Sequence, residues 1–171
     1  MLSTFKGFTL IELITVLSIA AIFLAAAVPG YYTIIQNNKV VTNTNKLASS
    51  LNLARMEAIK RGYKVSVCPA ANASLNSCGS SAQWPLGWIV FTDADNNNAI
   101  DSSNDMLNIS QAVPAGTSVT SANNIVSYDS TGFLLNGSTS ISVTASGCKG
   151  KNSRTINVST SGRLSVVLTS C

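Results

Sequence analysis

The feature that most constrains this chain is an apolar run near its start that contains a single charge. The run extends from Phe8 to Val28, and Glu12 is its only ionisable side chain. At about 1.5 Å of rise per residue, a helix over this run reaches roughly 30 Å, which is enough to cross the hydrocarbon core of a bilayer. A carboxylate in that core costs at least about 2.5 kcal/mol on insertion scales, so Glu12 needs a partner of opposite charge.

The nearest candidate for that partner is an amino group created by cleavage of the chain. If the chain is cut between Gly7 and Phe8, Phe8 carries a free α-amino group. Glu12 of one copy can then pair with this group on a neighbouring copy, with the two helices staggered by about one turn. The sequence therefore predicts that Glu12 acts in assembly.

This N-terminal pattern resembles the class III signal of type IV pilins and type II secretion pseudopilins. It combines a short leader with one lysine, the sequence Gly-Phe-Thr-Leu-Ile-Glu at 7–12, an apolar helix and Pro29. The resemblance implies cleavage by prepilin peptidase between Gly7 and Phe8 and N-methylation of Phe8. It also implies a single-pass protein of the bacterial inner membrane, with its globular domain in the periplasm before extraction to the cell surface. An ordinary signal anchor, or a secretory signal cut near 25–27, is the alternative, but it gives Glu12 no purpose.

The helical pattern continues beyond the membrane run. After Pro29, residues on one helical stripe predict a buried face: Val40, Thr44, Leu47, Leu51, Ala54 and Ala58. Polar residues such as Asn43 and Arg55 are expected to lie largely off this stripe. Pro29 and Gly30 predict a kink or local melting of the helix, and Gly62 predicts its C-terminal end.

Everything after Gly62 alternates between apolar and polar residues as strands do. The clearest strands are expected at 63–67, 86–91, 141–143, 155–158 and 164–168, with shorter candidates at 106–111, 117–120, 124–128 and 132–135. The expected fold class is α+β and type IV pilin-like: a long N-terminal helix packed on an antiparallel β domain of two small sheets. The expected segments are a leader at 1–7, a transmembrane helix at 8–29, an amphipathic helix at 30–61 and the β domain at 62–171.

Two segments carry a narrower resemblance. Residues 51–58 and 84–93 are similar to the end of the helix and the following strand of FimU/FimT minor pilins and H-type (GspH) pseudopilins. The resemblance implies a minor pilin near the tip of a type IV pilus that supports assembly with other pilin subunits. Because Glu12 needs the amine of another subunit, the outermost tip position is not expected. The alternative function is an H-type pseudopilin of a type II secretion system.

Four cysteines accompany this export signal, and an even number predicts two disulfides in an oxidising compartment. Three pairings are possible for Cys68, Cys78, Cys148 and Cys171. We favour Cys68–Cys78 and Cys148–Cys171, since each closes a local loop and the second pair lies at the open end of an expected hairpin. Zinc is the alternative use of the thiols, but the chain has no Cys-x-x-Cys pair and no histidine.

The segment 93–101 has two interpretations. Oxygen-bearing side chains follow positions 1, 3, 5 and 9 of a calcium loop at Asp93, Asp95, Asn97 and Asp101. Asn98 replaces the usual glycine, however, and Asn104 stands where a bidentate Glu is needed. The favoured interpretation is a turn whose Asp and Asn side chains bond their own backbone, so no cofactor is expected, with Ca²⁺ as the alternative.

A second hypothesis concerns the basic residues near the C-terminus. No acidic side chain follows Asp129, and the hypothesis is that four basic residues form one face for the DNA phosphate backbone: Lys149, Lys151, Arg154 and Arg163. Some FimT-type proteins capture DNA for natural transformation through a Gly-Arg-x-Arg motif. Here Gly162 and Arg163 match, but Ser165 replaces the second Arg. The favoured interpretation of these basic residues is a solvated edge that discourages strand aggregation, with DNA capture as the alternative.

An enzyme is not expected. The chain has no histidine, which excludes a Ser-His-Asp triad and removes the commonest general base. It also contains no phosphate-binding loop and no dinucleotide-binding glycine motif. Trp84, Trp88 and Phe91 lie around one expected strand, and core or subunit packing is favoured over ligand stacking for them.

Overall fold

The structure is a computed structural model that describes residues 7–171, except for the side chains of Ala26 and Pro29. Residues 1–6 of the expected leader lie outside the described residues. The chain divides into two compact units, 1–35 and 36–171, and each is considered by itself. Its elements are α1 (Leu10–Arg61), β1 (Val65–Pro69), η1 (Ser81–Leu86), β2 (Trp88–Thr92), η2 (Ser103–Asp105), β3 (Met106–Ser110), β4 (Thr117–Ser121), β5 (Val126–Tyr128), β6 (Thr139–Ala145), β7 (Ser153–Val158) and β8 (Leu164–Thr169).

The helix α1 begins and ends where local chemistry predicts. Thr9 precedes it, and the Thr9 hydroxyl accepts a hydrogen bond from the backbone N–H of Glu12 at 3.3 Å, which satisfies one free donor of the first turn. Gly62 follows the helix with φ 75°, a conformation that glycine adopts without strain. The local melting expected at Pro29 and Gly30 is not found, because the backbone is helical through both residues.

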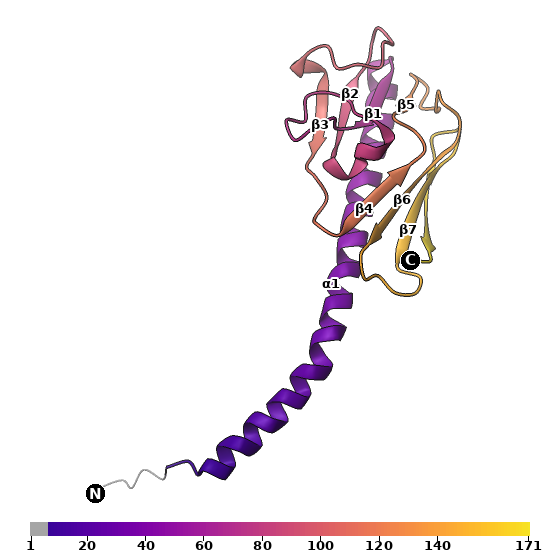
Figure 1. Cartoon of the computed structure of the whole chain (residues 1–171). Coiled ribbons are helices and arrows are strands. Elements are labelled where there is room, and N and C mark those ends of the chain that lie inside the picture. Colours follow the sequence, from indigo (N-terminus) through magenta and orange to yellow (C-terminus); the bar gives the residue numbers. More distant parts are fainter. Residues whose placement is uncertain (1–6) are drawn as a thin grey trace, which may run out of the picture. The chain divides into compact units, whose positions relative to one another are not determined.

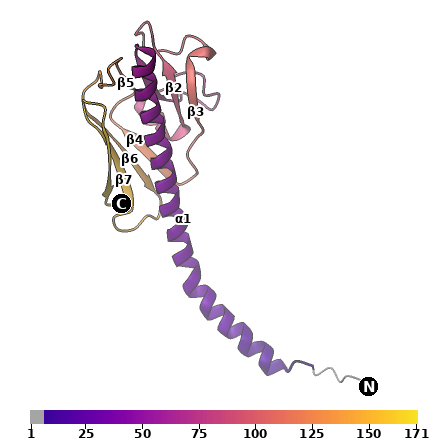
Figure 2. The same cartoon turned by 180° about the vertical axis from the view of Figure 1, so that it is seen from behind.

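The second unit contains two four-stranded antiparallel sheets. The first has the strand order β3-β2-β1-β5, and the second has the order β4-β6-β7-β8. Seen from behind, the second half of α1 runs across the strands, with β2 and β3 on one side and β6 and β7 on the other (Figure 2). The expected α+β, pilin-like fold with two small sheets is confirmed (Figure 1).

The core forms where the helical stripe meets both sheets. All six residues of the expected stripe are buried, and the five apolar ones share one cluster with Val90 of the first sheet and Ile141 of the second. The expectation for Asn43 is wrong: it is buried, because its amide can donate to the backbone carbonyl of Lys39 at 2.8 Å and so enter the core with its donor satisfied.

The tryptophans and Phe91 are core residues, as favoured. Trp84, Trp88 and Phe91 are all at most 1 % exposed. The indole N–H of Trp88 donates to the hydroxyl of Ser50 on α1 at 2.9 Å, so its one polar atom is paired inside the core. Burial on this scale leaves none of the three rings free to stack on a ligand.

Residues 132–135 form a loop and not the expected short strand, apart from one bridge between Tyr128 and Leu134. The cause is Asp129, whose carboxylate accepts hydrogen bonds from the backbone N–H groups of Thr131 and Phe133 at 2.8 and 3.0 Å. Burial alone would raise the pKa of Asp129, but these bonds and the Thr131 hydroxyl hold it below its ordinary value. Local side-chain bonds of this kind compete with strand pairing, and here they fold the chain back.

Candidate functional site

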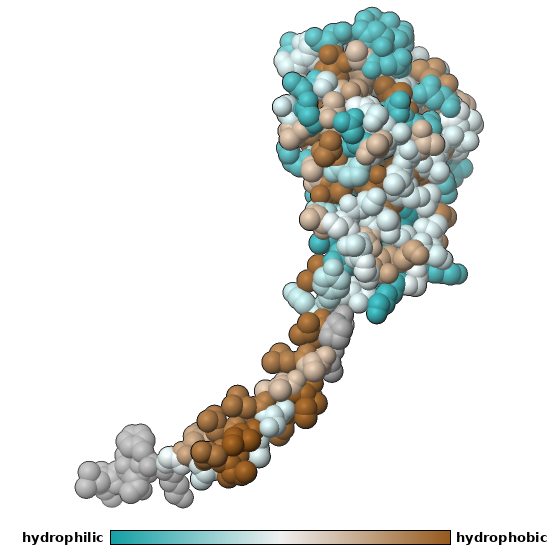
Figure 3. All heavy atoms as spheres, in the orientation of Figure 1, coloured by the Kyte–Doolittle hydropathy of each residue, from teal (hydrophilic) through white to brown (hydrophobic). Residues whose placement is uncertain are grey.

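The first candidate site is the N-terminal part of α1. The large apolar side chains from Phe8 to Val28 are between 50 and 81 % exposed, and Figure 3 shows apolar residues along this part of the helix. Among residues 7–171, α1 is the one helix long and apolar enough to cross a membrane, with a mean hydropathy of 2.5 in its most apolar window. An apolar surface of this extent needs cover from lipid or from other subunits.

Glu12 lies within this apolar surface without an ion-pair partner among the described residues. Its carboxylate is 3.5 Å from the hydroxyl of Thr9, a contact too long to neutralise a charge in lipid. The partner that the sequence predicts, the α-amino group of Phe8 in another copy, would have to come from outside this chain. Glu12 is thus exposed and without an ion pair in the described part of the chain, and its pairing with another copy stays a prediction.

The two disulfides follow the pairing favoured from the sequence. Cys68 joins Cys78, and Cys148 joins Cys171 at the open end of the β7–β8 hairpin. Among the described residues no cysteine is free, so none of these thiols is left for zinc. The second bridge fixes the end of β8, the last strand of the second sheet.

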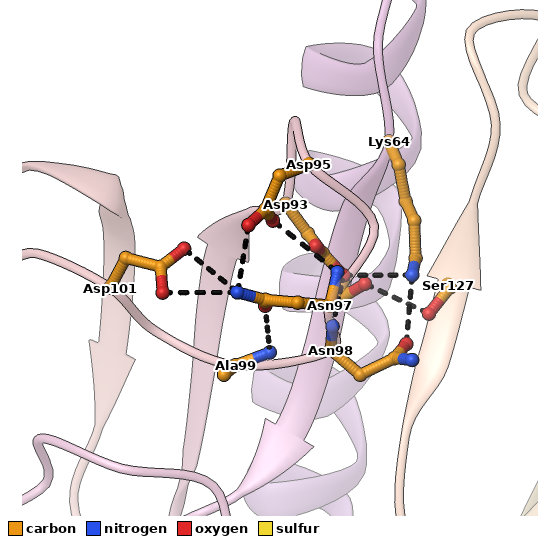
Figure 4. A network of polar contacts seen from close by, with 9 residues as sticks. Lys64, Asp93, Asp95, Asn97, Asn98, Ala99, Asp101 and Ser127 are labelled. Carbon is orange, nitrogen blue, oxygen red and sulfur yellow. Dashed lines mark hydrogen bonds and ion pairs between the residues drawn. The ribbon is translucent and has the colours of Figure 1, made fainter.

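The structure does not gather the four expected calcium ligands into one ligand set. Asp93 forms an ion pair with Lys64, whereas the Asn97 amide group donates to the carboxylates of Asp95 and Asp101 (Figure 4). Asn97 thus presents nitrogen, which does not bind calcium, to its acidic neighbours. The described residues contain no group of three or more His, Cys, Asp or Glu side chains placed to hold a metal ion. Calcium binding stays a prediction, and the contacts seen are those of the turn.

The structure places the four basic residues in two groups, one at each end of β7. Lys149 and Lys151 lie in the β6–β7 loop, and Arg154 lies near the start of β7. Arg163 lies in the β7–β8 turn at the other end of the strand, since Val158 pairs with Leu164 next to it. With about 3.3 Å of rise per residue, the length of β7 separates the two ends by roughly 15 Å.

Sequence analysis missed several polar residues that the fold brings together. Arg55 donates to the carbonyls of Gly132 and Ser161, and Lys64 contacts Asp93 and Asn98. None of these contacts has a local sequence signal, because the partners come from segments distant in the chain.

Comparisons with known proteins agree with this geometry. Residues 43–162 match the family described as type II transport protein GspH, and residues 2–28 match the prokaryotic N-terminal methylation motif. A comparison with curated proteins found no match.

Two solved structures share the fold. The type IV minor pilin FimU of Pseudomonas aeruginosa superposes with a TM-score of 0.61 at 16 % identity, over 76 % of this chain and 89 % of that chain. The minor pseudopilin EpsH from the type 2 secretion system of Vibrio cholerae superposes with a TM-score of 0.55 at 12 % identity, over 76 % of this chain and 97 % of that chain.

The methylation motif and the apolar helix support membrane anchoring of a soluble domain, and the family implies assembly with other pilin subunits. The matched region covers more than half of the chain. The chain therefore belongs to the GspH family, a structural group of minor pilins and pseudopilins.

Proposed function

We propose that this chain is a minor pilin, a structural subunit near the tip of a type IV pilus that supports pilus assembly. The observation that carries the proposal is that Glu12, the only charge of the exposed apolar segment 8–28, has no ion-pair partner within the described chain. Prepilin peptidase cleaves between Gly7 and Phe8, and the freed amine of one subunit then meets Glu12 of the next. Before extraction, α1 holds the protein in the inner membrane with the β domain in the periplasm.

The alternative is an H-type pseudopilin that works in protein export, and the shared fold with both FimU and EpsH fits either role. A strain that lacks this chain separates the two. We expect it to lose most surface pili, counted by electron microscopy, while the amounts of secreted proteins in the medium stay unchanged. Complementation with the intact chain is the control. Normal piliation combined with a loss of secretion would replace the pilus role by the secretion role.

DNA capture is a second candidate function, and the charge distribution of the β domain supports it. No acidic side chain follows Asp129 in the sequence, and Lys149 and Lys151 are exposed at the disulfide-bonded end of the second sheet, with Arg154 nearby. Such a group can bind the phosphate backbone without reading its sequence. Because Arg163 lies at the opposite end of β7, it provides a matched basic control.

We expect Lys149→Gln and Lys151→Gln each to weaken binding of the full-length protein to double-stranded DNA in a gel-shift series, whereas Arg163→Gln leaves it unchanged. If three phosphates are contacted, the affinity of the wild type falls by about 40-fold between 50 and 200 mM salt, since each contact releases counterions. Binding to the phosphate backbone through these lysines would be ruled out if the affinity did not change with salt concentration, or if neither lysine variant weakened it.

A further inference from the structure

A largely buried lysine side chain lies where the first sheet meets the loop that follows β2. Lys64 precedes β1, and Asp93 follows β2 directly. The strand register pairs Val65 with Thr92, and the N–H of Asp93 donates to the carbonyl of Lys64 at 3.0 Å, so the two residues are held opposite each other. Their positions are set by the sheet and not by a flexible loop.

Three functional groups converge at this point. The Nζ of Lys64 is 2.8 Å from Oδ2 of Asp93 and 2.8 Å from Oδ1 of Asn98. Both contacts are drawn in Figure 4. The backbone N–H of Asn98 donates to the same Oδ2 of Asp93 at 3.1 Å. An amine, a carboxylate and a carboxamide carbonyl are therefore in direct contact. The Cγ of Asn98, one bond beyond Oδ1, lies within reach of the amine.

Lys64 and Asp93 are more enclosed than an ordinary surface ion pair. The side chain of Lys64 is 9 % exposed and that of Asp93 is 0 % exposed. The second oxygen of Asp93, Oδ1, is buried and has no hydrogen-bond partner among the described residues. A buried polar atom without a partner requires an explanation.

Asn98 is held in place by its backbone. Its φ is 63°, in the left-handed region that asparagine tolerates better than most residues, and its N–H is fixed on Asp93. Asn98 is also exposed, so a group released from its side chain can leave into solvent. The arrangement positions the electrophile against the nucleophile and leaves an exit for the product.

We propose that Lys64 and Asn98 form an intramolecular amide bond, with Asp93 as the proton carrier. Asp93 first accepts a proton from the Lys64 ammonium, which frees the Nζ lone pair. Nζ then attacks Cγ of Asn98, the Nζ–Cγ bond forms, and the protonated Asp93 polarises the carbonyl. The Cγ–Nδ2 bond breaks, and protons from Nζ and Asp93 convert the leaving nitrogen to ammonium. One lysine ammonium and one carboxamide thus become one amide and one ammonium ion, with no oxidant or other reactant.

This bond would tie the loop after β2 to the chain just beyond the end of α1. The helix ends at Arg61 and β1 begins at Val65, so Lys64 lies in the short connection between them. A pull on the helix would then pass through a covalent link into the β2–β3 loop in addition to the strand hydrogen bonds. The proposal concerns the β domain alone and does not depend on the filament in which the protein acts.

The test is the mass of the full-length protein purified in detergent. We expect the wild type to have lost one ammonia molecule and the Lys64→Arg and Asn98→Ala variants to have kept it. Each variant should therefore differ from the wild type by the mass change of its substitution plus the mass of one ammonia molecule. Lys64→Arg keeps a positive charge beside Asp93 but has no primary amine. Mass changes from leader removal and methylation are the same in the wild type and the variants, so they cancel in the comparison. Lys60→Arg and Asn104→Ala, at an exposed lysine and an exposed asparagine, are the controls and should show no such excess.

Reduction and digestion of the wild type should also release a branched peptide that contains both Lys64 and Asn98. The proposal is overturned if the mass of the wild type matches its sequence after leader removal and methylation and its digest yields a linear peptide with an unmodified Lys64. This readout needs only the wild type, so it stands even if a variant fails to fold. The mass measurement does not depend on piliation or secretion. A failure of the amide-bond proposal can therefore be told apart from a failure of the proposed function.

Discussion

Replacing Glu12 with alanine is expected to abolish or cripple entry of the protein into filaments while leaving its β domain folded. In the wild type, an unpaired carboxylate in the membrane costs at least about 2.5 kcal/mol, and pairing with the Phe8 amine of a neighbour removes that cost. The variant has neither the cost nor the attraction, so it should accumulate in the membrane. At about 1.4 kcal/mol per tenfold, we expect incorporation to fall by at least about tenfold.

The measurement is the ratio of this protein in sheared filaments to that in membranes, determined by immunoblot. Glu57→Ala is a suitable control, because Glu57 is a carboxylate in the second half of the same helix that pairs with Lys60 and Arg61. The hydrogen bond from Arg61 lowers the pKa of Glu57, but surface pairs of this kind contribute little stability. Incorporation of Glu12→Ala at the wild-type level would contradict the role given to this residue.

The parts of the fold that were predictable from the sequence are those with a strong local period. The helical stripe from Val40 to Ala58 was confirmed because burial on a helix follows spacing alone. The end of α1 at Arg61 was equally local, since Gly62 supplies the conformation that ends a helix. The segment at 132–135 was missed because Asp129 offers the backbone hydrogen bonds that a strand would otherwise take.

The candidate sites depended more on tertiary placement. The DNA hypothesis placed the basic residues on one face from their spacing, although the predicted hairpin already put Arg163 at the turn and Lys149 and Lys151 at its open end. Lys64 lacked any signal, because a lone lysine beside a strand is usually a solvated residue. Its burial arises from Asp93 and Asn98, which only the pairing of β1 with β2 brings near.

Arg55 is a second residue whose tertiary contacts could not be predicted from the sequence. It was expected off the apolar stripe of α1, and nothing in its local sequence indicates a structural role. In the structure its Nε donates to the carbonyl of Gly132 at 3.1 Å and its Nη2 donates to the carbonyl of Ser161 at 2.9 Å. The first carbonyl belongs to the loop after β5 and the second to the β7–β8 turn, so one side chain joins α1 to both sheets.

The two turns also meet each other at this point. The N–H of Leu134 donates to the carbonyl of Thr160 at 2.9 Å. A Cβ added at Gly162 would lie 2.0 Å from the carbonyl oxygen of Gly132 and 2.8 Å from Nε of Arg55. Gly162 must therefore lack a side chain, since the space is taken by the carbonyl and the guanidinium that hold the turns together.

We expect Arg55→Met to lower the stability of the β domain by about 2–4 kcal/mol, because hydrogen bonds to a charged donor contribute about 1.5–3 kcal/mol each and two half-buried carbonyls would lose their partner. Methionine keeps most of the apolar stem, so the loss reports the guanidinium and not the packing. For a domain of this size the melting temperature should fall by roughly 10 °C. Thermal melting of the full-length protein in detergent, followed by circular dichroism, measures it.

Arg61→Met is the matched control in the same helix. Arg61 pairs with Glu57 at the surface, and its side chain is 37 % exposed, so its loss should cost less than about 1 kcal/mol. If Arg55→Met melts as the wild type does, the bridge between the sheets is not what holds the two turns on α1. The direct contact of Gly162 with the Gly132 carbonyl would then have to do so, and Gly162→Ala should be the more destabilising change.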